Sequence, residues 1–130
     1  MGKYLAKIIA SDQEGLRMIS ACSSGAKVKV SDIKYLASNK VFLLSIKRTK
    51  IEADKDGKKI NSICRFDFVD KVRSKNINQL NKDLVLELIG IDYLKNNDDY
   101  EINLIFNNNA HIALTTEAIE ARLEDQNEIK

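Results

Sequence analysis

The stretch TTEAIEARLEDQNEIK (residues 115–130) decides the predicted fold. Thr115 or Thr116 is a plausible helix N-cap, and the glutamates that follow suit the positive end of a helix dipole. Ile119 and Leu123 are four residues apart, so they would lie on one face of a helix. The stretch therefore predicts a short closing helix that buries this apolar face.

Arg122 stands beside the residues that this helix would bury. Its aliphatic stem can pack on a sheet while its guanidinium reaches a carboxylate. Asp125, three residues further on, is the local candidate, and Asp67 is a more distant one. We predict that Arg122 and Asp125 form a structural latch between the closing helix and the sheet.

The sequence before this helix contains several segments in which apolar residues recur at every second position, as they do in strands. Residues 40–50 and 100–106 show this pattern. In residues 60–70 the pattern would place four side chains on one face: Ile60, Cys64, Phe66 and Phe68. Asp56-Gly57 is a turn signal between residues 40–50 and residues 60–70, so we expect these two segments to form a long hairpin.

Residues 11–25 predict an early helix. Ser11 followed by Glu14 forms the pattern of a capping box, which satisfies two free amide donors at a helix start. Gly25 supplies the left-handed conformation that commonly ends a helix.

The whole pattern predicts an α+β fold within a single domain of residues 1–130. We expect a strongly bent antiparallel sheet of about seven strands, with an early helix and a C-terminal capping helix. This order of elements is similar to that of the pleckstrin-homology-like roll.

Composition narrows the class of protein. An apolar fraction of 44%, a charged fraction of 31% and a net charge of +2 are typical of a soluble globular protein. The apolar run at the start is too short for a signal sequence or a membrane span, so we expect a cytoplasmic protein. Cys22 and Cys64 lack the spacing of zinc or redox motifs, and with one histidine we expect no metal and no cofactor.

The most biased stretch, residues 47–75, has ten basic residues against five acidic ones. Such a stretch could bind an anion or a nucleic-acid backbone. A solvated hairpin whose lysines protect its edges is the more common explanation of such a pattern. The candidate anion-binding residues are Lys47, Arg48, Lys58, Lys59, Arg65 and Arg73.

The sequence contains no nucleotide-binding loop and no nucleophile elbow. A dyad of His111 with Cys22 or Cys64 remains possible from the sequence, because such partners need only be close in space. No residue is predicted to be catalytic, and an enzyme is the less favoured class.

Four segments resemble an uncharacterised alphaproteobacterial family of single-domain proteins of unknown function: SDQEGLRMISAC, SDIKYLASNKVF, FDFVDKVRSKNI and IEARLED. The last is the most specific. The resemblance implies a small bacterial cytoplasmic protein and supplies no activity, cofactor or catalytic residue. The lysine-rich and asparagine-rich loops depart from the family pattern.

We therefore expect a non-enzymatic module that binds a protein or a peptide, for which an exposed strand edge would suffice. The alternative is an anion-binding or nucleic-acid-binding protein that uses the basic residues of 47–75. The sequence predicts neither the identity of the partner nor the oligomeric state.

Overall fold

The computed structural model describes residues 6–49 and 59–128, which form ten strands and one α-helix. Two 3₁₀ turns, η1 (Val30–Asp32) and η2 (Ala37–Asn39), flank the third strand. The elements are β1 (Lys7–Ala10), α1 (Gln13–Ser23), β2 (Lys27–Lys29), β3 (Ile33–Leu36), β4 (Val41–Thr49), β5 (Lys59–Phe66), β6 (Val69–Lys75), β7 (Val85–Asn96), β8 (Asp99–Phe106), β9 (His111–Thr116) and β10 (Ala121–Glu128).

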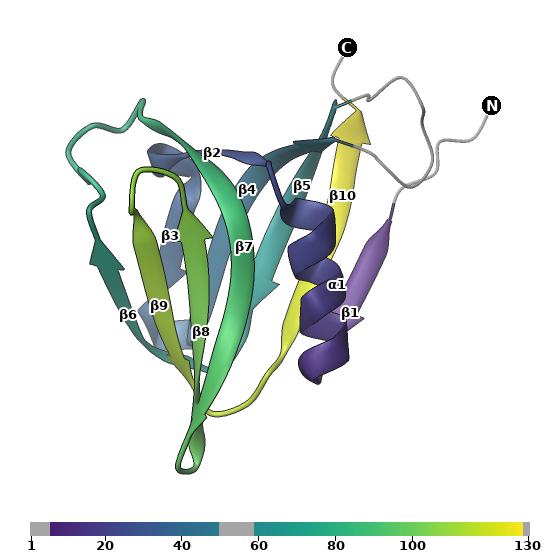
Figure 1. Ribbon diagram of the computed structural model, residues 1–130, viewed down its shortest axis with the longest axis vertical. Coiled ribbons are helices and arrows are strands. Elements are labelled where there is room, and N and C mark those ends of the chain that lie inside the picture. The colour runs from purple at the N-terminus through teal and green to yellow at the C-terminus, as the bar shows by residue number, and fades with distance from the viewer. Residues whose placement is uncertain (1–5, 50–58, 129–130) are drawn as a thin grey trace.

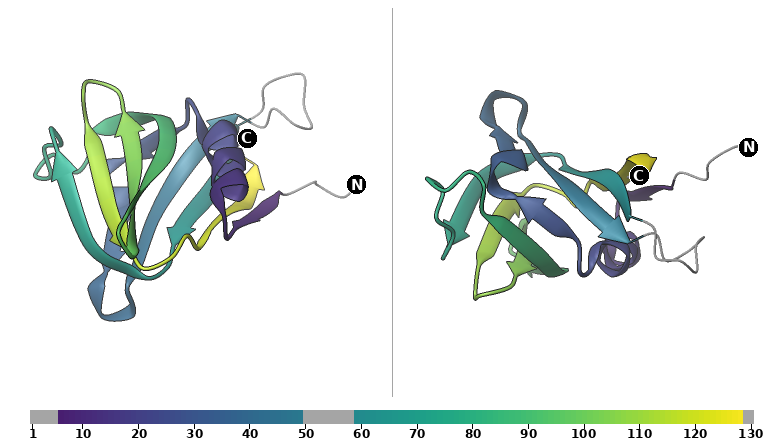
Figure 2. Two further views of the ribbon diagram at one scale, coloured as in Figure 1. Left: turned by 60° about the horizontal axis from the view of Figure 1, so that its bottom comes forward. Right: turned by 90° about the horizontal axis from the view of Figure 1, so that it is seen from above.

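All pairings are antiparallel, and the strands follow the order β1-β10-β5-β4-β2-β7-β8-β9-β6, with β3 paired to β4. The sheet bends so strongly that β7, β8 and β9 lie in front of β3, β4 and β5 (Figure 1). Strand β2 connects the two layers because it pairs with β4 on one side and β7 on the other. Helix α1 lies beside β7 and contacts β1 (Figure 2).

The predicted closing helix is wrong, because residues 121–128 form strand β10 between β1 and β5. Burial alternates along it: Ala121, Leu123 and Asp125 are buried, whereas Arg122 and Glu124 are half-buried on the other face. The four-residue spacing of Ile119 and Leu123 fits either a helix or a strand. Pairing with two neighbouring strands decides for the strand, since every second residue then faces the core.

The structure also contradicts the predicted α+β class, and with it the sheet of about seven strands and the pleckstrin-homology-like roll. The described residues form a ten-stranded sheet, and their one α-helix comes early in the chain rather than as a C-terminal cap. No helix in this part of the chain is long and apolar enough to cross a membrane.

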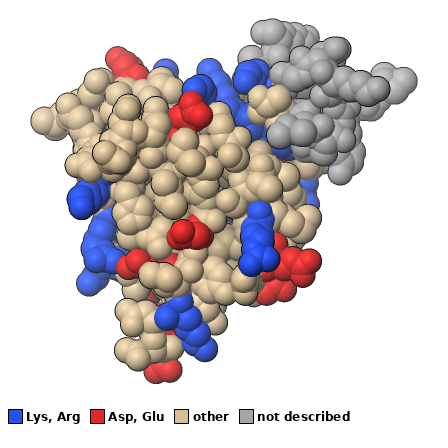
Figure 3. Space-filling view, in the orientation of Figure 1, with Lys and Arg blue, Asp and Glu red and all other residues tan. Residues whose placement is uncertain are grey.

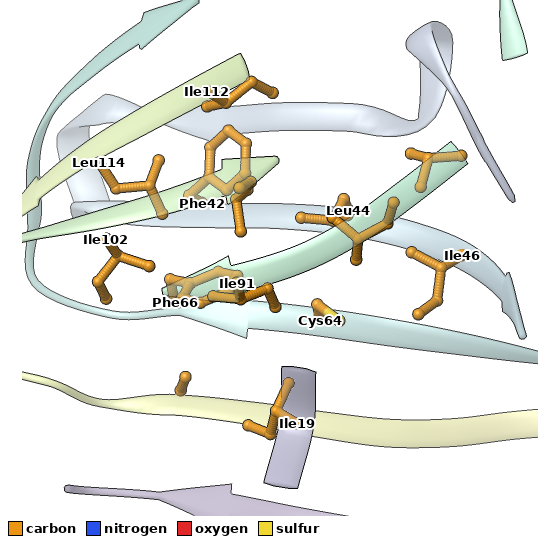
Figure 4. Packing of buried hydrophobic residues seen from close by; sticks show 14 of the residues in the cluster. Ile19, Phe42, Leu44, Ile46, Cys64, Phe66, Ile91, Ile102, Ile112 and Leu114 are labelled. Carbon is orange, nitrogen blue, oxygen red and sulfur yellow. The ribbon is translucent and has the colours of Figure 1, made fainter. Parts of the chain in front are cut away.

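The core fills the space between the two layers (Figure 4). Phe42 on β4 and Phe66 on β5 face each other with ring centroids 6.3 Å apart. Ile102, Leu104 and Phe106 on β8 are buried, as their alternation predicts. The shared face predicted for residues 60–70 is confirmed for Ile60, Cys64 and Phe66, which are buried on β5, but Phe68 does not belong to it.

Phe68 lies at the bend between β5 and β6, with a φ of 60° and 47% of its surface exposed. A positive φ cannot continue a strand, so the chain turns here and leaves the back layer for the front one. The predicted turn at Asp56-Gly57 lies outside the described residues.

Helix α1 begins one residue later than the predicted capping box. Asp12 is the N-cap, and its Oδ1 accepts a hydrogen bond from the Gly15 amide at 2.8 Å. Gly25 adopts a φ of 85° just after the helix, as predicted for a left-handed end.

Gly15 allows α1 to lie directly against β1. A Cβ on this residue would approach Ala10 Cα to 2.8 Å and Ala10 Cβ to 2.9 Å. In an open helix, Gly→Ala stabilises by about 1 kcal/mol, but here we expect Gly15→Ala to destabilise the protein by about 1–3 kcal/mol through overpacking. Urea denaturation measures this, and a gain in stability would show that β1 and α1 can separate at no cost.

Candidate functional site

Strands β3 and β6 each leave one edge without a ladder partner among the described residues. The two edges are on opposite walls of one groove, because β3 ends the back layer and β6 ends the front layer. We call this the β3–β6 groove. Unpaired strand edges carry backbone donors and acceptors that a further strand can satisfy.

Two hydrogen bonds close the groove at one end. The Tyr35 hydroxyl donates to the Val69 carbonyl oxygen at 2.8 Å, and the Val69 amide donates to the Lys40 carbonyl oxygen at 2.8 Å. The Lys40 ammonium lies 2.9 Å from Asp70 and 3.7 Å from Glu117. The hydrogen bond and charge of Asp70 raise the pKa of Lys40 above its ordinary value, and Glu117 adds to this effect.

The groove encloses about 290 Å³ above an apolar floor. Phe42 and Ile112, which line it, are also core residues, so the floor is rigid. The apolar lining comprises Val30, Ile33, Tyr35, Phe42, Val72, Ile77 and Ile112. Ser74, Gln79 and Lys82 add polar groups, and the Gln79 amide donates to the Ser74 hydroxyl at 2.7 Å.

The loop of residues 76–84 borders the groove and contains two successive turns. Leu80, next to Gln79, is 92% exposed. A large apolar side chain this accessible contributes nothing to the core, but it is available to a partner that reaches the groove.

The predicted basic residues do not gather into one surface. Arg65 pairs with Asp67 at 2.9 Å, and Arg73 on the front layer pairs with Glu101 at 2.6 Å. The Lys59 ammonium donates to the Thr49 hydroxyl at 2.9 Å. Lys47 lies on β4 near two lysines of β2, and Lys58 lies outside the described residues. Figure 3 shows that charged side chains on the front face are scattered among uncharged ones.

Arg48 is fully buried, so it cannot meet an external anion in this conformation. Its Nε donates to Asp125 Oδ1 at 3.0 Å, and its Nη2 donates to Asp125 Oδ2 at 2.8 Å. The Ser62 hydroxyl and the Ala6 amide donate to the same carboxylate at 2.6 and 2.7 Å. Asp125 therefore belongs to a buried network that joins β4, β5 and β10.

The latch was predicted with the wrong arginine. Asp125 faces the core and pairs with Arg48, whereas Arg122 lies on the opposite face of β10, beside Arg65 and Ile9 of the neighbouring strands. No helix is present at these positions to be latched.

Acid should weaken this network. Burial by itself raises the pKa of Asp125, but the hydrogen bonds from Arg48, Ser62 and Ala6 outweigh it and lower the pKa below its ordinary value. The stabilisation is complete above the unfolded-state pKa of about 3.9 and is lost as the pH falls through the lower folded-state pKa. Urea unfolding from neutral to acid pH should show a loss of stability that is smaller in Asp125→Asn, and identical profiles would contradict this.

Cys64 and His111 have different surroundings. Cys64 is buried, with its Sγ 3.9 Å from the Ser23 hydroxyl, and burial raises its pKa to about 12. His111 Nε2 lies 2.8 Å from Asn103 Oδ1, on the face of β9 opposite the buried Ile112. Because the pKa of the Cys64 thiol is so high, this thiol is a poor nucleophile.

Residues 6–49 and 59–128 hold no group of three or more His, Cys, Asp or Glu side chains placed to bind a metal.

The fold and the groove define a small antiparallel β-sheet protein with an open strand-lined groove. The chain belongs to the family described as "Protein of unknown function (DUF2948)", which matches residues 6–130. This confirms the predicted resemblance to a family of unknown function.

A crystal structure of an uncharacterized protein from Neisseria gonorrhoeae is similar, with a TM-score of 0.47 and 15% sequence identity, over 75% of this chain and 90% of that one. No curated protein matches the sequence.

Proposed function

We propose that this protein is a non-enzymatic module that binds an extended segment of a partner protein in the β3–β6 groove. The observation that carries the proposal is the pair of strand edges, on either side of an apolar floor, that have no ladder partner in residues 6–49 and 59–128. A bound segment would add a strand, so its backbone would pair with an edge while alternate side chains entered the groove. We propose that the module acts in the cytoplasm as one domain of residues 1–130.

The charges around the groove favour a segment with acidic residues. Lys82 lines the groove and has no ionic partner among the described residues. Three lysines on the outer faces of the edge strands also lack an ionic partner in this part of the chain, and they would lie beside the outward side chains of an added strand: Lys34, Lys71 and Lys75. Asp70, the acidic residue of β6, is already paired with Lys40. Complementary charge increases the association rate and the selectivity of such an interface.

The test begins with selection of peptides from a random library displayed on phage, followed by fluorescence-anisotropy titration of a selected synthetic peptide. We expect selected sequences that alternate apolar residues and include acidic ones. ¹⁵N-labelled full-length protein should show chemical-shift changes along β3 and β6 when the peptide is added.

Val72→Lys places a charge in the groove wall, so it should weaken peptide binding at least about tenfold, a loss of about 1.4 kcal/mol. Ile105→Lys is the matched control, because Ile105 is a partly exposed strand residue of the same layer, on the outer face of β8. The control should bind within about twofold of the wild type. Shift changes confined to another surface, or equal binding by both variants, would overturn the proposal.

A further inference from the structure

The sheet contains a slot where β2 separates from β4. These strands share one paired position, Lys27 with Lys47, and the next pairing to β4 is that of Ile33 with Leu44. Residues 28–32 therefore stand opposite only residues 45–46. The extra residues form η1, whose Val30 and Ser31 amides donate to the Leu84 and Lys82 carbonyl oxygens and so face away from β4.

This divergence opens a cavity of about 310 Å³ that reaches the side chain of Ile46, an otherwise buried residue. The lysine slot, as we name it, has eight lining residues, three of them lysines and one an acid: Lys27, Lys29, Asp32, Ser45, Ile46, Lys47, Asn61 and Val85. The slot and the β3–β6 groove lie on either side of η1, since Val30 lines the groove.

The lysines of the slot are incompletely neutralised. The Lys27 ammonium pairs with Glu87 at 2.7 Å, but the ammonium groups of Lys29 and Lys47 have no ion pair and no hydrogen bond within the described part of the chain. Lys27 and Lys47 are directly opposite on neighbouring strands, an arrangement that destabilises a sheet when both residues carry the same charge. An anion between these ammonium groups would remove that repulsion.

We propose that the lysine slot binds the phosphoryl group of a small phosphate monoester. Lysine ammonium groups bind phosphate as point charges, and the Ser45 hydroxyl and Asn61 amide can donate to further phosphate oxygens. Ile46 and Val85 offer apolar surface to the organic part of the ligand. The cavity is at the lower end of the range for small-molecule sites, so the ligand is a small one. This inference is independent of the peptide proposal, because the two cavities share no lining residue.

The test is a titration of ¹⁵N-labelled full-length protein with glycerol 3-phosphate, and separately with inorganic phosphate. We expect saturable shift changes at residues 27–32, 45–47 and 61. Saturation by the ester at lower concentration than by inorganic phosphate would support a site for a monoester. Equal or tighter binding of inorganic phosphate would overturn the assignment to an ester.

The variant Lys29→Gln/Lys47→Gln should weaken binding of glycerol 3-phosphate at least about tenfold. It should leave the melting temperature unchanged or higher, because one like-charge pair is removed. The control, Lys71→Gln/Lys75→Gln, removes the same charge from β6 and should bind within about twofold of the wild type.

A single-stranded oligonucleotide serves as the competing ligand. If it binds tightly with steep salt dependence and is weakened equally by both double variants, the lysines act as a diffuse electrostatic surface and the slot is not a site. Absence of saturable shifts with the ester would also overturn the proposal.

Discussion

Arg48→Met should lower the free energy of unfolding by about 3–5 kcal/mol, the usual cost of breaking a buried ion pair by removing one partner. Methionine fills a similar volume, so the loss comes mainly from the Asp125 carboxylate, which would remain buried without its cation. The Ser62 and Ala6 donors would still contact it, but neither carries a charge.

A second substitution separates charge from packing. Asp125→Asn removes the negative charge and keeps one acceptor oxygen, which can take the Ala6 amide, while the Ser62 hydroxyl can turn to accept from the new amide group. Arg48→Met/Asp125→Asn should therefore be more stable than Arg48→Met alone, and urea denaturation of the four proteins of this cycle measures the coupling. A double variant less stable than Arg48→Met would show that the hydrogen bonds accepted by the two carboxylate oxygens, rather than the unpaired negative charge, decide the stability of the Arg48→Met protein.

Phe66→Ala should cost about 3–5 kcal/mol, because the ring is fully buried and the core can collapse only partly around the lost volume. Phe66 lies where β5 pairs with Phe42 of β4 on one side and Ala121 of β10 on the other. A cavity there would loosen three strands at once. Thermal and urea unfolding give the change.

Phe68→Ala is the control for this prediction. It lies two residues away, is 47% exposed and stands at the bend before β6, so its loss should change stability by about 0.5 kcal/mol or less. Similar losses in the two variants would contradict the assignment of Phe66 to the core and Phe68 to the surface.

Local patterns predicted the parts of the fold that depend on local physics. The alternation of Tyr100, Ile102, Leu104 and Phe106 predicted strand β8 correctly. The capping pattern at Ser11 and Glu14, together with Gly25, predicted both ends of α1 to within about two residues. These elements have one periodicity and clear ends, so no distant contact is needed to recognise them.

The prediction for residues 115–130 was wrong because their apolar pattern fits both a helix and a strand. Ile119 and Leu123 satisfy a helical spacing, and Ala121 between them is too small to mark the strand face clearly. The strand forms because β5 and β1 lie on either side of it, and β5 is more than 50 residues away in the chain. Once the segment is placed as a strand, Asp125 falls at a buried position, and a buried carboxylate requires a buried partner.

The partner of Asp125 could not be found from the sequence, because Arg48 is 77 residues away and is one of ten basic residues in a biased stretch. Composition predicted a surface role for all of them. Likewise, Lys27 and Lys29 lie outside that stretch, so only the pairing of β2 with β4 brings them close to Lys47.

The place of β10 between β1 and β5 has a consequence for synthesis of the chain. Strand β1 pairs Ile8 with Leu123 and has β10 as its one ladder partner among the described strands, so this pairing cannot form until residues 121–124 have been made. Contacts between such distant residues slow folding, because a long loop must close before they form. During translation, α1 can pack against β1 and then against β7, but the edge of β1 stays unpaired until β10 is made, and this edge is the part that a chaperone would protect.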